Sequence, residues 1–398
     1  MRKTVYLIEQ PLDARNYQRF GIQAWIDRNW TVEVWDLTPW AHPAVWEHFT
    51  EGAQKPQKFA GYFPVASKGE FARMLSKSEK IDYFIDLTGE NYHALRAKLF
   101  LKRSGAVRVV CASGSIPLPE RNGYKGLLSK FAQLVARGPS GFFRWLTNAF
   151  CLKVIAPHIT SDLGVVAGQK SIDSAKKCHQ IIRAHNFDYD IYLQLAKKTR
   201  RAGGDYLVFI DQDRCFHVEY IYQRSSSTVT PEKYFPVICS GLKRISEALR
   251  MEVRIAGHPR ATHQKSSADY FKGFPVEYGR TAELIRDCKV VVGHDSTALQ
   301  FAVLFAKPIV FVTTDELTRS SYEGGLIANM AAELGKKPIN LDGDLSSVDW
   351  RAQLDVDTVR YALYRSRFIK TDGSPELPLW QIVINHIERA RSRLQEQA

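Results

Sequence analysis

Short apolar runs alternate with amphipathic segments along the chain, a pattern typical of repeated parallel α/β units. The first unit has a strand over residues 4–8, a helix over 17–28 and a strand over 31–35. Further apolar runs predict strands that each end in a polar loop, at residues 83–87, 107–112, 163–167, 180–184, 206–210, 253–256 and 290–292. Helical spacing follows at residues 191–200, 231–250, 298–305 and 377–394. This order predicts parallel sheets with helices on both faces.

A basic stretch between residues 117 and 157 interrupts the alternation, which restarts at residue 162. We therefore expect a first Rossmann-like domain over residues 1–157, with 117–157 as an insert. A second Rossmann-like domain is expected over residues 158–370, and a C-terminal helix within 371–398 that packs back. A chain of 398 residues suits two domains of ordinary size.

Composition narrows the class of protein. A hydrophobic content of 45% with 12% aromatic residues excludes general disorder. No apolar run approaches the roughly 20 residues of a membrane span, and no signal-peptide core follows Met1, so we expect a cytoplasmic location. The six cysteines are far apart and form no CxxC pair, so the sequence predicts reduced thiols and neither a zinc site nor a disulfide framework.

The formal charge of +13 requires an explanation. No nucleic-acid-binding motif is present and the cations are not gathered in one recognition helix, so nucleic acid is not the expected partner. Residues 117–157 hold six Lys or Arg and one acid, interleaved with Leu, Phe and Trp. Two interpretations stay open: peripheral contact with an anionic membrane surface on the inner face of the cytoplasmic membrane, or a helix pair with a buried apolar face and solvated charges.

Two strand ends carry groups suited to a phosphate. Gly257-His258-Pro259-Arg260 follows one strand, and Gly293-His294-Asp295-Ser296-Thr297 follows the other and precedes a helix with Ser296 or Thr297 as its N-cap. Cations together with helix-terminal amides hold anions without a metal ion. The candidate phosphate-binding residues are His258, Pro259, Arg260, His294, Ser296 and Thr297.

Other strand ends carry further polar groups with two possible roles each. Asp211 and Asp213 follow the strand over 206–210 and are either reacting carboxylates or turn formers. Lys170 and Ser171 are either contacts of a donor sugar or part of an ordinary turn, and His185 is either a group of the site or a neighbour of a helix N-cap.

The first strand end, which lacks GxGxxG, carries Glu9 and Arg15. These two residues either meet the acceptor side of a sugar site or take part in capping the helix that follows.

Taken together, these motifs are similar to a known family. The segments 184–190, 209–212, 255–259 and 293–298 with 307–309 resemble the retaining β-Kdo transferases of bacterial capsule and lipopolysaccharide assembly, and more weakly the bacterial sialyltransferases. The resemblance covers about residues 162–314, with a looser one near the N-terminus. It implies the GT-B glycosyltransferase architecture, a CMP-Kdo donor, a growing, lipid-linked glycan as acceptor, and no metal or other cofactor. It assigns the reacting carboxylate to Asp211, and the family has an aromatic residue where this chain has Asp213.

The expected activity is transfer of Kdo with retention, by double displacement through an aspartate nucleophile. One alternative keeps the fold and changes the donor, giving an inverting CMP-sialic acid-type transferase or a CDP-polyol phosphotransferase. The other is a non-enzymatic basic binding module. Asp211 and Asp213 beside the cations argue against a nucleic-acid groove.

Overall fold

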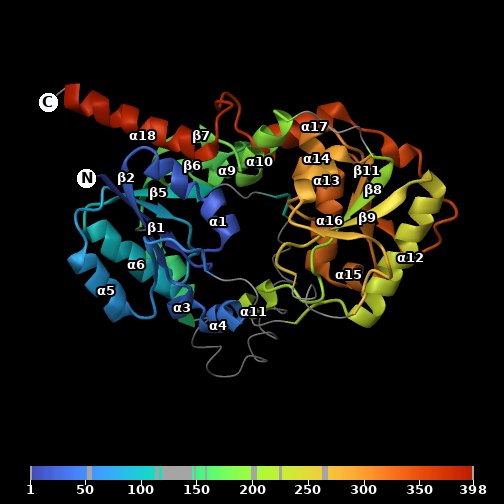
Figure 1. Ribbon diagram of the computed structural model, residues 1–398, viewed down its shortest axis with the longest axis horizontal. Coiled ribbons are helices and arrows are strands. Elements are labelled where there is room, and N and C mark those ends of the chain that lie inside the picture. The colour runs from blue at the N-terminus through green and yellow to red at the C-terminus, as the bar shows by residue number, and fades with distance from the viewer. Residues whose placement is uncertain are drawn as a thin grey trace.

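The computed structural model consists of two parallel sheets that lie side by side, each covered by helices on both faces (Figure 1). A single connection and a returning C-terminal helix join the two lobes. The structure describes residues 2–51, 56–112, 116–118, 146–147, 149–156, 159–198, 204–223, 226–261 and 268–396. This arrangement confirms the expected pair of Rossmann-like domains.

The first sheet has the strand order β3-β2-β1-β4-β5-β6-β7, and all of its strands are parallel. Its central strand β1 is buried on both faces, as expected for a sheet between two helix layers. The strands are β1 (Arg2–Ile8), β2 (Trp30–Asp36), β3 (Tyr62–Pro64), β4 (Tyr83–Asp86), β5 (Val107–Ala112), β6 (Ser161–Ala167) and β7 (Cys178–Ala184). Their carboxyl ends therefore lie along one edge.

The domain boundary expected at residues 157–158 is wrong. Strand β6 pairs with β5, with Val165 opposite Cys111, and β7 extends the same sheet to its edge. The basic stretch is thus a long connection between neighbouring strands of one sheet, and the chain leaves this sheet only after Ala184. Local sequence shows where a strand is, whereas its partner is set by long-range pairing.

Helices cover the two faces of the first sheet in separate apolar clusters. On one face lie α1 (Ala14–Arg19), α2 (Ile22–Ile26) and α18 (Leu379–Glu396); on the other lie α3 (Thr38–Ala41), α5 (Lys68–Lys77) and α6 (Tyr92–Arg103). Helix α4 (Pro43–Glu51) packs against α3 and α11 (Glu219–Gln223). The helix expected over 17–28 is divided at Gly21, which has φ +58°. A Cβ at Gly21 would lie 2.2 Å from the ring of Trp380, so glycine permits this close contact with α18.

The second sheet has the order β10-β9-β8-β11-β12-β13 and is also parallel. Its strands are β8 (Tyr206–Ile210), β9 (Glu252–Gly257), β10 (Val276–Tyr278), β11 (Val290–Gly293), β12 (Ile309–Thr313) and β13 (Ile339–Asn340). The helices from α9 onward are α9 (Gln169–Ser174), α10 (Phe187–Ala196), α11 (Glu219–Gln223), α12 (Pro231–Leu249), α13 (Thr281–Asp287), α14 (Leu299–Leu304), α15 (Asp315–Arg319), α16 (Ser321–Glu333) and α17 (Thr358–Tyr364). Short helical turns are η1 (Cys151–Ile155), η4 (Ala352–Leu354) and η5 (Arg365–Ile369).

The C-terminal helix returns to the first lobe, as expected (Figure 1). After η5 the chain runs into α18, whose Trp380 packs edge-on against Tyr6 of β1 with ring centroids 5.4 Å apart. Glu388 of the same helix forms ion pairs with Arg2 and Arg28. These contacts fix α18 to the first sheet although it follows the second in sequence.

Most of the basic stretch 117–157 lies outside the described residues. Among its described side chains, Leu146, Phe150 and Val154 are 47%, 56% and 46% exposed, whereas Cys151 is buried in a small apolar cluster with Leu95 and Ile159. In the part of the chain that the structure describes, no helix is both long and apolar enough to cross a bilayer.

Candidate functional site

Two contacts join the lobes at the carboxyl ends of their central strands. Arg260, three residues after β9, donates from Nη2 to Asp13 Oδ2 over 3.3 Å. Tyr222 of α11 donates from its hydroxyl to the backbone oxygen of Glu9, also over 3.3 Å. We call Glu9, Asp13, His42, Tyr222 and Arg260 the interdomain site. It has acidic groups from the first domain and a cation from the second.

Glu9 is an ionised carboxylate at the end of β1. Its Oε2 accepts a hydrogen bond from the Gly89 amide (3.0 Å), and its Oε1 accepts one from Asn91 Nδ2 (2.6 Å). His42 Nε2 lies 3.8 Å from Oε2. Burial by itself would raise the pKa of Glu9, but His42, Asn91 and Gly89 together lower it below its ordinary value. The carboxylate is therefore charged at neutral pH and held in one orientation.

His42 is a residue of the site that the sequence patterns did not single out. It follows α3, and its ring packs edge-on against Tyr222 of the other domain with centroids 5.1 Å apart. The only sequence signal is a histidine six residues after the end of strand β2. His42 therefore connects the carboxylate of Glu9 to the second domain.

Asp36, at the end of β2, is fully buried beside Glu9. Its Oδ1 accepts from the Thr38 amide (2.8 Å) and hydroxyl, and its Oδ2 accepts from the Tyr62 hydroxyl (2.5 Å). Burial raises the pKa of Asp36 to about 6, with a further contribution from the charge of Glu9, and the hydrogen bonds oppose this rise only in part. Ionised Asp36 therefore destabilises the folded state at neutral pH.

We expect Asp36→Asn to stabilise the protein above pH 6. A raised carboxyl pKa means that the folded state binds the proton more tightly than the unfolded chain, so the free energy of unfolding falls as the pH rises from about 4 to about 6. A shift of roughly two pKa units corresponds to about 3 kcal/mol. Urea unfolding at about pH 4 and pH 7.5 measures the free energy of unfolding of both proteins. The value for the variant minus that for the wild type should be about 3 kcal/mol larger at pH 7.5 than at pH 4. An equal difference at both pH values would contradict the assignment.

The cationic side of the site comes from the segment after β9. The Nδ1 of His258 accepts from the Arg260 amide (3.3 Å), and the His258 ring lies 4.9 Å from that of His217. Burial, together with the positive charges of Arg19 and Arg260, lowers the pKa of Arg15 below its ordinary value. Arg15 and Arg260 therefore lie within electrostatic reach of one another, as a phosphate site needs. Pro259, between His258 and Arg260, is half-buried.

Asp211 holds the ends of β8 and β9 together. Its Oδ1 accepts from the Asp213 amide (2.9 Å), and its Oδ2 accepts from the His258 amide (3.3 Å). The side chain is 2% exposed. Asp213 is 1% exposed and has a left-handed backbone with φ +51°, so it occupies a tight turn. Both carboxylates thus follow β8, and Asp211 contacts the end of the neighbouring strand β9, which carries His258.

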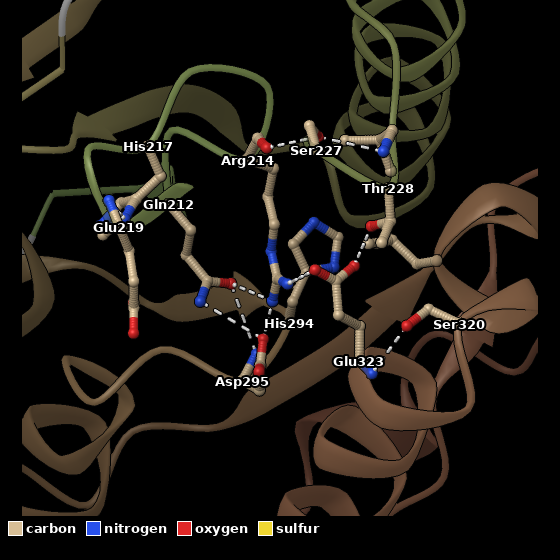
Figure 2. A network of polar contacts seen from close by, with 12 residues as sticks. Gln212, Arg214, His217, Glu219, Ser227, Thr228, His294, Asp295, Ser320 and Glu323 are labelled. Carbon is tan, nitrogen blue, oxygen red and sulfur yellow. Dashed lines mark hydrogen bonds and ion pairs between the residues drawn. The ribbon is translucent and has the colours of Figure 1, made fainter. Parts of the chain in front are cut away.

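A buried polar network lies next to this strand end (Figure 2). Arg214 is 8% exposed and reaches between two acids: its Nη2 pairs with Asp295 Oδ1, and its Nη1 lies 3.7 Å from Glu323 Oε1. Gln212 donates to the same Asp295 oxygen over 3.3 Å and accepts from Arg214 over 3.2 Å. Thr228 also donates to Glu323. The network fixes the loops after β8 and β11 and the start of α16.

The structure does not bring His294 to the interdomain site, which corrects its assignment as a phosphate ligand. The residue is fully buried, with Nδ1 2.7 Å from the Val312 carbonyl and Nε2 2.9 Å from the Tyr234 hydroxyl. Burial first and then the charge of Arg214 lower its pKa to about 3. His294 is a neutral core histidine that holds β11, β12 and α12 together.

Ser171 and His185 are also structural, contrary to their expected place at a donor sugar. The fully buried Ser171 hydroxyl donates to the Gly168 carbonyl (2.7 Å) and accepts from the Ala167 amide (2.8 Å). The fully buried His185 ring lies 3.0 Å from the Asn186 carbonyl and 2.8 Å from the Leu377 carbonyl, where the chain returns to α18. Lys170 is exposed on α9, and no described contact places it at the interdomain site.

The segment after β11, residues 293–297, which was also predicted to bind phosphate, does not cap the following helix as expected. Helix α14 begins at Leu299 with Ala298 as its N-cap, so neither Ser296 nor Thr297 caps it. The Ser296 hydroxyl accepts from the Ala298 amide (3.2 Å), which tightens the turn. Thr297 is exposed at the same turn. Both residues remain at the carboxyl end of β11, two strands from β9 in the sheet.

No family model matches the sequence, and no curated protein matches it. Similar solved structures include a Listeria monocytogenes protein assigned as a UDP-N-acetylglucosamine 2-epimerase, with TM-score 0.50, 14% identity and coverage of 98% of this chain and 97% of that one. The S. aureus MnaA–UDP co-structure has TM-score 0.48, 12% identity and coverage of 98% and 97%. The glycotransferase of kitacinnamycin has TM-score 0.44, 13% identity and coverage of 96% and 93%. Together with the two parallel sheets and the returning helix, the first likeness identifies the fold as GT-B.

Proposed function

We propose that this chain is a glycosyltransferase that moves Kdo from CMP-Kdo to a growing bacterial surface glycan of the lipopolysaccharide or capsule type, with retention of configuration. The observation that carries the proposal is the interdomain site, where Arg260, beside His258, meets Asp13, and Tyr222 contacts the backbone of Glu9. Cations on one side suit the departing CMP phosphate, and carboxylates on the other suit an acceptor hydroxyl. Three of the four motifs that resemble Kdo transferases, 209–212, 255–259 and 293–298, lie at the ends of the neighbouring strands β8, β9 and β11.

The proposed chemistry follows from these groups. His258 and Arg260 stabilise the negative charge that develops on the leaving phosphate, and Ser296 and Thr297 contribute hydroxyl and amide donors at the neighbouring turn. A carboxylate on the opposite face of the anomeric carbon attacks it, and the acceptor then displaces that carboxylate, so two inversions give net retention. We assign the attack to Asp211, which the backbone amides of Asp213 and His258 hold in a single orientation. No step in this scheme requires a metal ion or another cofactor.

The acceptor is proposed to approach over the first domain. Glu9 is ionised and oriented, which suits a hydrogen-bond acceptor or a base for a sugar hydroxyl. Arg15, near Arg260, suits an anionic group on the sugar. A lipid-linked glycan would bring the enzyme to the inner face of the cytoplasmic membrane. Peripheral attachment there is a proposal that the basic stretch 117–157 motivated.

We expect His258→Ala to weaken CMP binding about 10- to 150-fold. The range corresponds to about 1.5–3 kcal/mol for one hydrogen bond to a charged group. Isothermal titration calorimetry with CMP in EDTA measures it, with the exposed His179→Ala of β7 as a matched control. Unchanged affinity for CMP in the His258 variant, or binding that requires Mg²⁺, would contradict the placement of the CMP phosphate beside His258.

A donor panel separates this proposal from the other functions. Product analysis with CMP-Kdo, CMP-sialic acid, a CDP-polyol and UDP-sugars should give transfer from CMP-Kdo alone, with the anomeric configuration retained. Inverted product from CMP-sialic acid or transfer from a CDP-polyol would select the alternatives on the same fold. Binding of UDP in preference to CMP would refute the cytidine donor, and no turnover with any donor would favour a binding module.

A further inference from the structure

A groove separate from the interdomain site lies between the edge strand β7 and the returning helix α18. It has a volume of about 350 Å³. One wall comes from residues 180–183 of β7 and the other from α18 and the segment before it. Among the described strands β7 pairs only with β6, so this groove follows the edge of the first sheet as far as the structure describes it.

The charge of the groove has one sign. Arg183 of β7 and Arg389 and Arg393 of α18 line it, and all three residues are exposed. No Asp or Glu is among the described residues that line it, and none of the three arginines forms an ion pair within the described part of the chain. Two acids, Glu388 and Glu396, line the adjacent hollow on α18 together with Arg389 and Arg393, and Glu388 is already paired with Arg2 and Arg28. Three cations without counterions favour an anionic ligand.

The floor of the groove is apolar. Ile181, which is 37% exposed, lies in it with Leu377 and Ile382. His386 lines the same space, and its Nε2 is buried without a hydrogen-bond partner among the described residues. Burial and the charges of Arg389 and Arg393 lower the pKa of His386, so the arginines supply the positive charge near neutral pH. A free phosphate would need the arginines but not the apolar floor.

We propose that this groove binds the phosphate headgroup of an anionic phospholipid and so docks the protein on a membrane surface. The arginines pair with the phosphate, and the apolar floor receives the first part of the lipid tail. Figure 1 shows the last turns of α18 extending beyond the first sheet. The inference rests on the proposed function only in that a lipid-linked acceptor brings the enzyme to a bilayer.

Vesicle flotation of the full chain, without any nucleotide sugar, tests the groove separately from the proposed reaction. We expect binding to vesicles of phosphatidylglycerol and phosphatidylcholine but not to phosphatidylcholine alone. Arg389→Gln with Arg393→Gln should weaken binding about 30-fold, because each arginine near an anionic surface contributes about a factor of five. Arg183→Gln, on the opposite wall, should weaken it about fivefold. The control is Lys243→Gln with Arg244→Gln on the exposed face of α12, which removes the same charge and should leave binding unchanged.

Four results would overturn the proposal. The first is an equal loss of vesicle binding in the groove and control variants, and the second is binding without a preference for phosphatidylglycerol. The third is a loss of binding only when the cations of 117–157 are replaced. The fourth is competition for the groove by glycerol 3-phosphate at the concentration of accessible lipid. The last result would assign the groove to a soluble phosphate ester. Thermal melting of each variant separates a docking defect from unfolding. CMP titration remains unaffected in either case, because the groove and the interdomain site share no residue.

Discussion

Asp211→Asn should abolish glycosyl transfer while CMP binding stays within a few-fold of wild type. The carboxylate acts on the anomeric carbon in the transition state and does not contact the nucleotide in the proposed scheme, so its loss lowers kcat with little effect on nucleotide affinity. The amide of asparagine cannot attack the anomeric carbon as a carboxylate does. Single-turnover assays with CMP-Kdo, together with calorimetry for CMP, measure the two quantities.

The intermediate gives a direct test of the same assignment. Intact-protein mass spectrometry after incubation with CMP-Kdo should show one glycosyl adduct, and proteolysis should place it on the peptide that contains Asp211. The asparagine variant should show none. An adduct on Asp213 would exchange the two roles, and product of inverted configuration would leave Asp211 as a general base at most.

Asp213→Asn is the matched control for Asp211→Asn. Asn tolerates the left-handed backbone that Asp213 adopts, so the turn should survive and activity should remain measurable. Asp211→Asn carries a structural cost of its own, because its side chain accepts hydrogen bonds from two backbone amides and the new NH₂ group would face one of them. We expect that cost to be about 1–3 kcal/mol of unfolding free energy. A thermal melt therefore has to show that the inactive variant is folded.

Arg214→Met should lower the free energy of unfolding by about 3–5 kcal/mol. The substitution leaves the buried Asp295 and the half-buried Glu323 without the cation that lies between them, and uncompensated buried charge is among the most destabilising changes in a protein (Figure 2). Urea unfolding at neutral pH measures the loss. Glu323→Gln in the same chain should restore part of it, because one of the two unpaired charges is removed.

An exposed ion pair provides the comparison for Arg214. Lys289 lies 3.5 Å from Asp205, with side chains 53% and 87% exposed, so Lys289→Met should cost less than about 1 kcal/mol. If Arg214→Met costs no more than this control, the buried network does not hold the loops after β8 and β11. In that case Glu323→Gln combined with Arg214→Met should not raise the free energy of unfolding above that of Arg214→Met alone.

Strand ends show how far local pattern predicts a site. Gly257-His258 and Gly293-His294 have the same order of residues after a buried strand, and this pattern predicted both histidines as phosphate ligands. His258 lies beside Arg260 and His217, whereas His294 packs against Phe209 and Tyr234 in the core. The difference comes from α12, which covers His294 and which no local pattern places there. A histidine at a strand end is therefore a ligand or a core residue according to the helix above it.

The sequence by itself located nine of the thirteen strands of the described residues, missing β3, β10, β12 and β13, and it indicated that the strands are parallel and that a C-terminal helix crosses back. These properties follow from apolar runs and helical spacing within short windows, which local side-chain geometry decides. Only the tertiary structure decided that β6 and β7 belong to the first sheet, that His42 and Tyr222 meet at Glu9, and that Ser171 and His185 are buried. Pairing partners and the direction of a side chain at a strand end depend on contacts between segments distant in sequence, and those contacts exist only once the sheets are assembled.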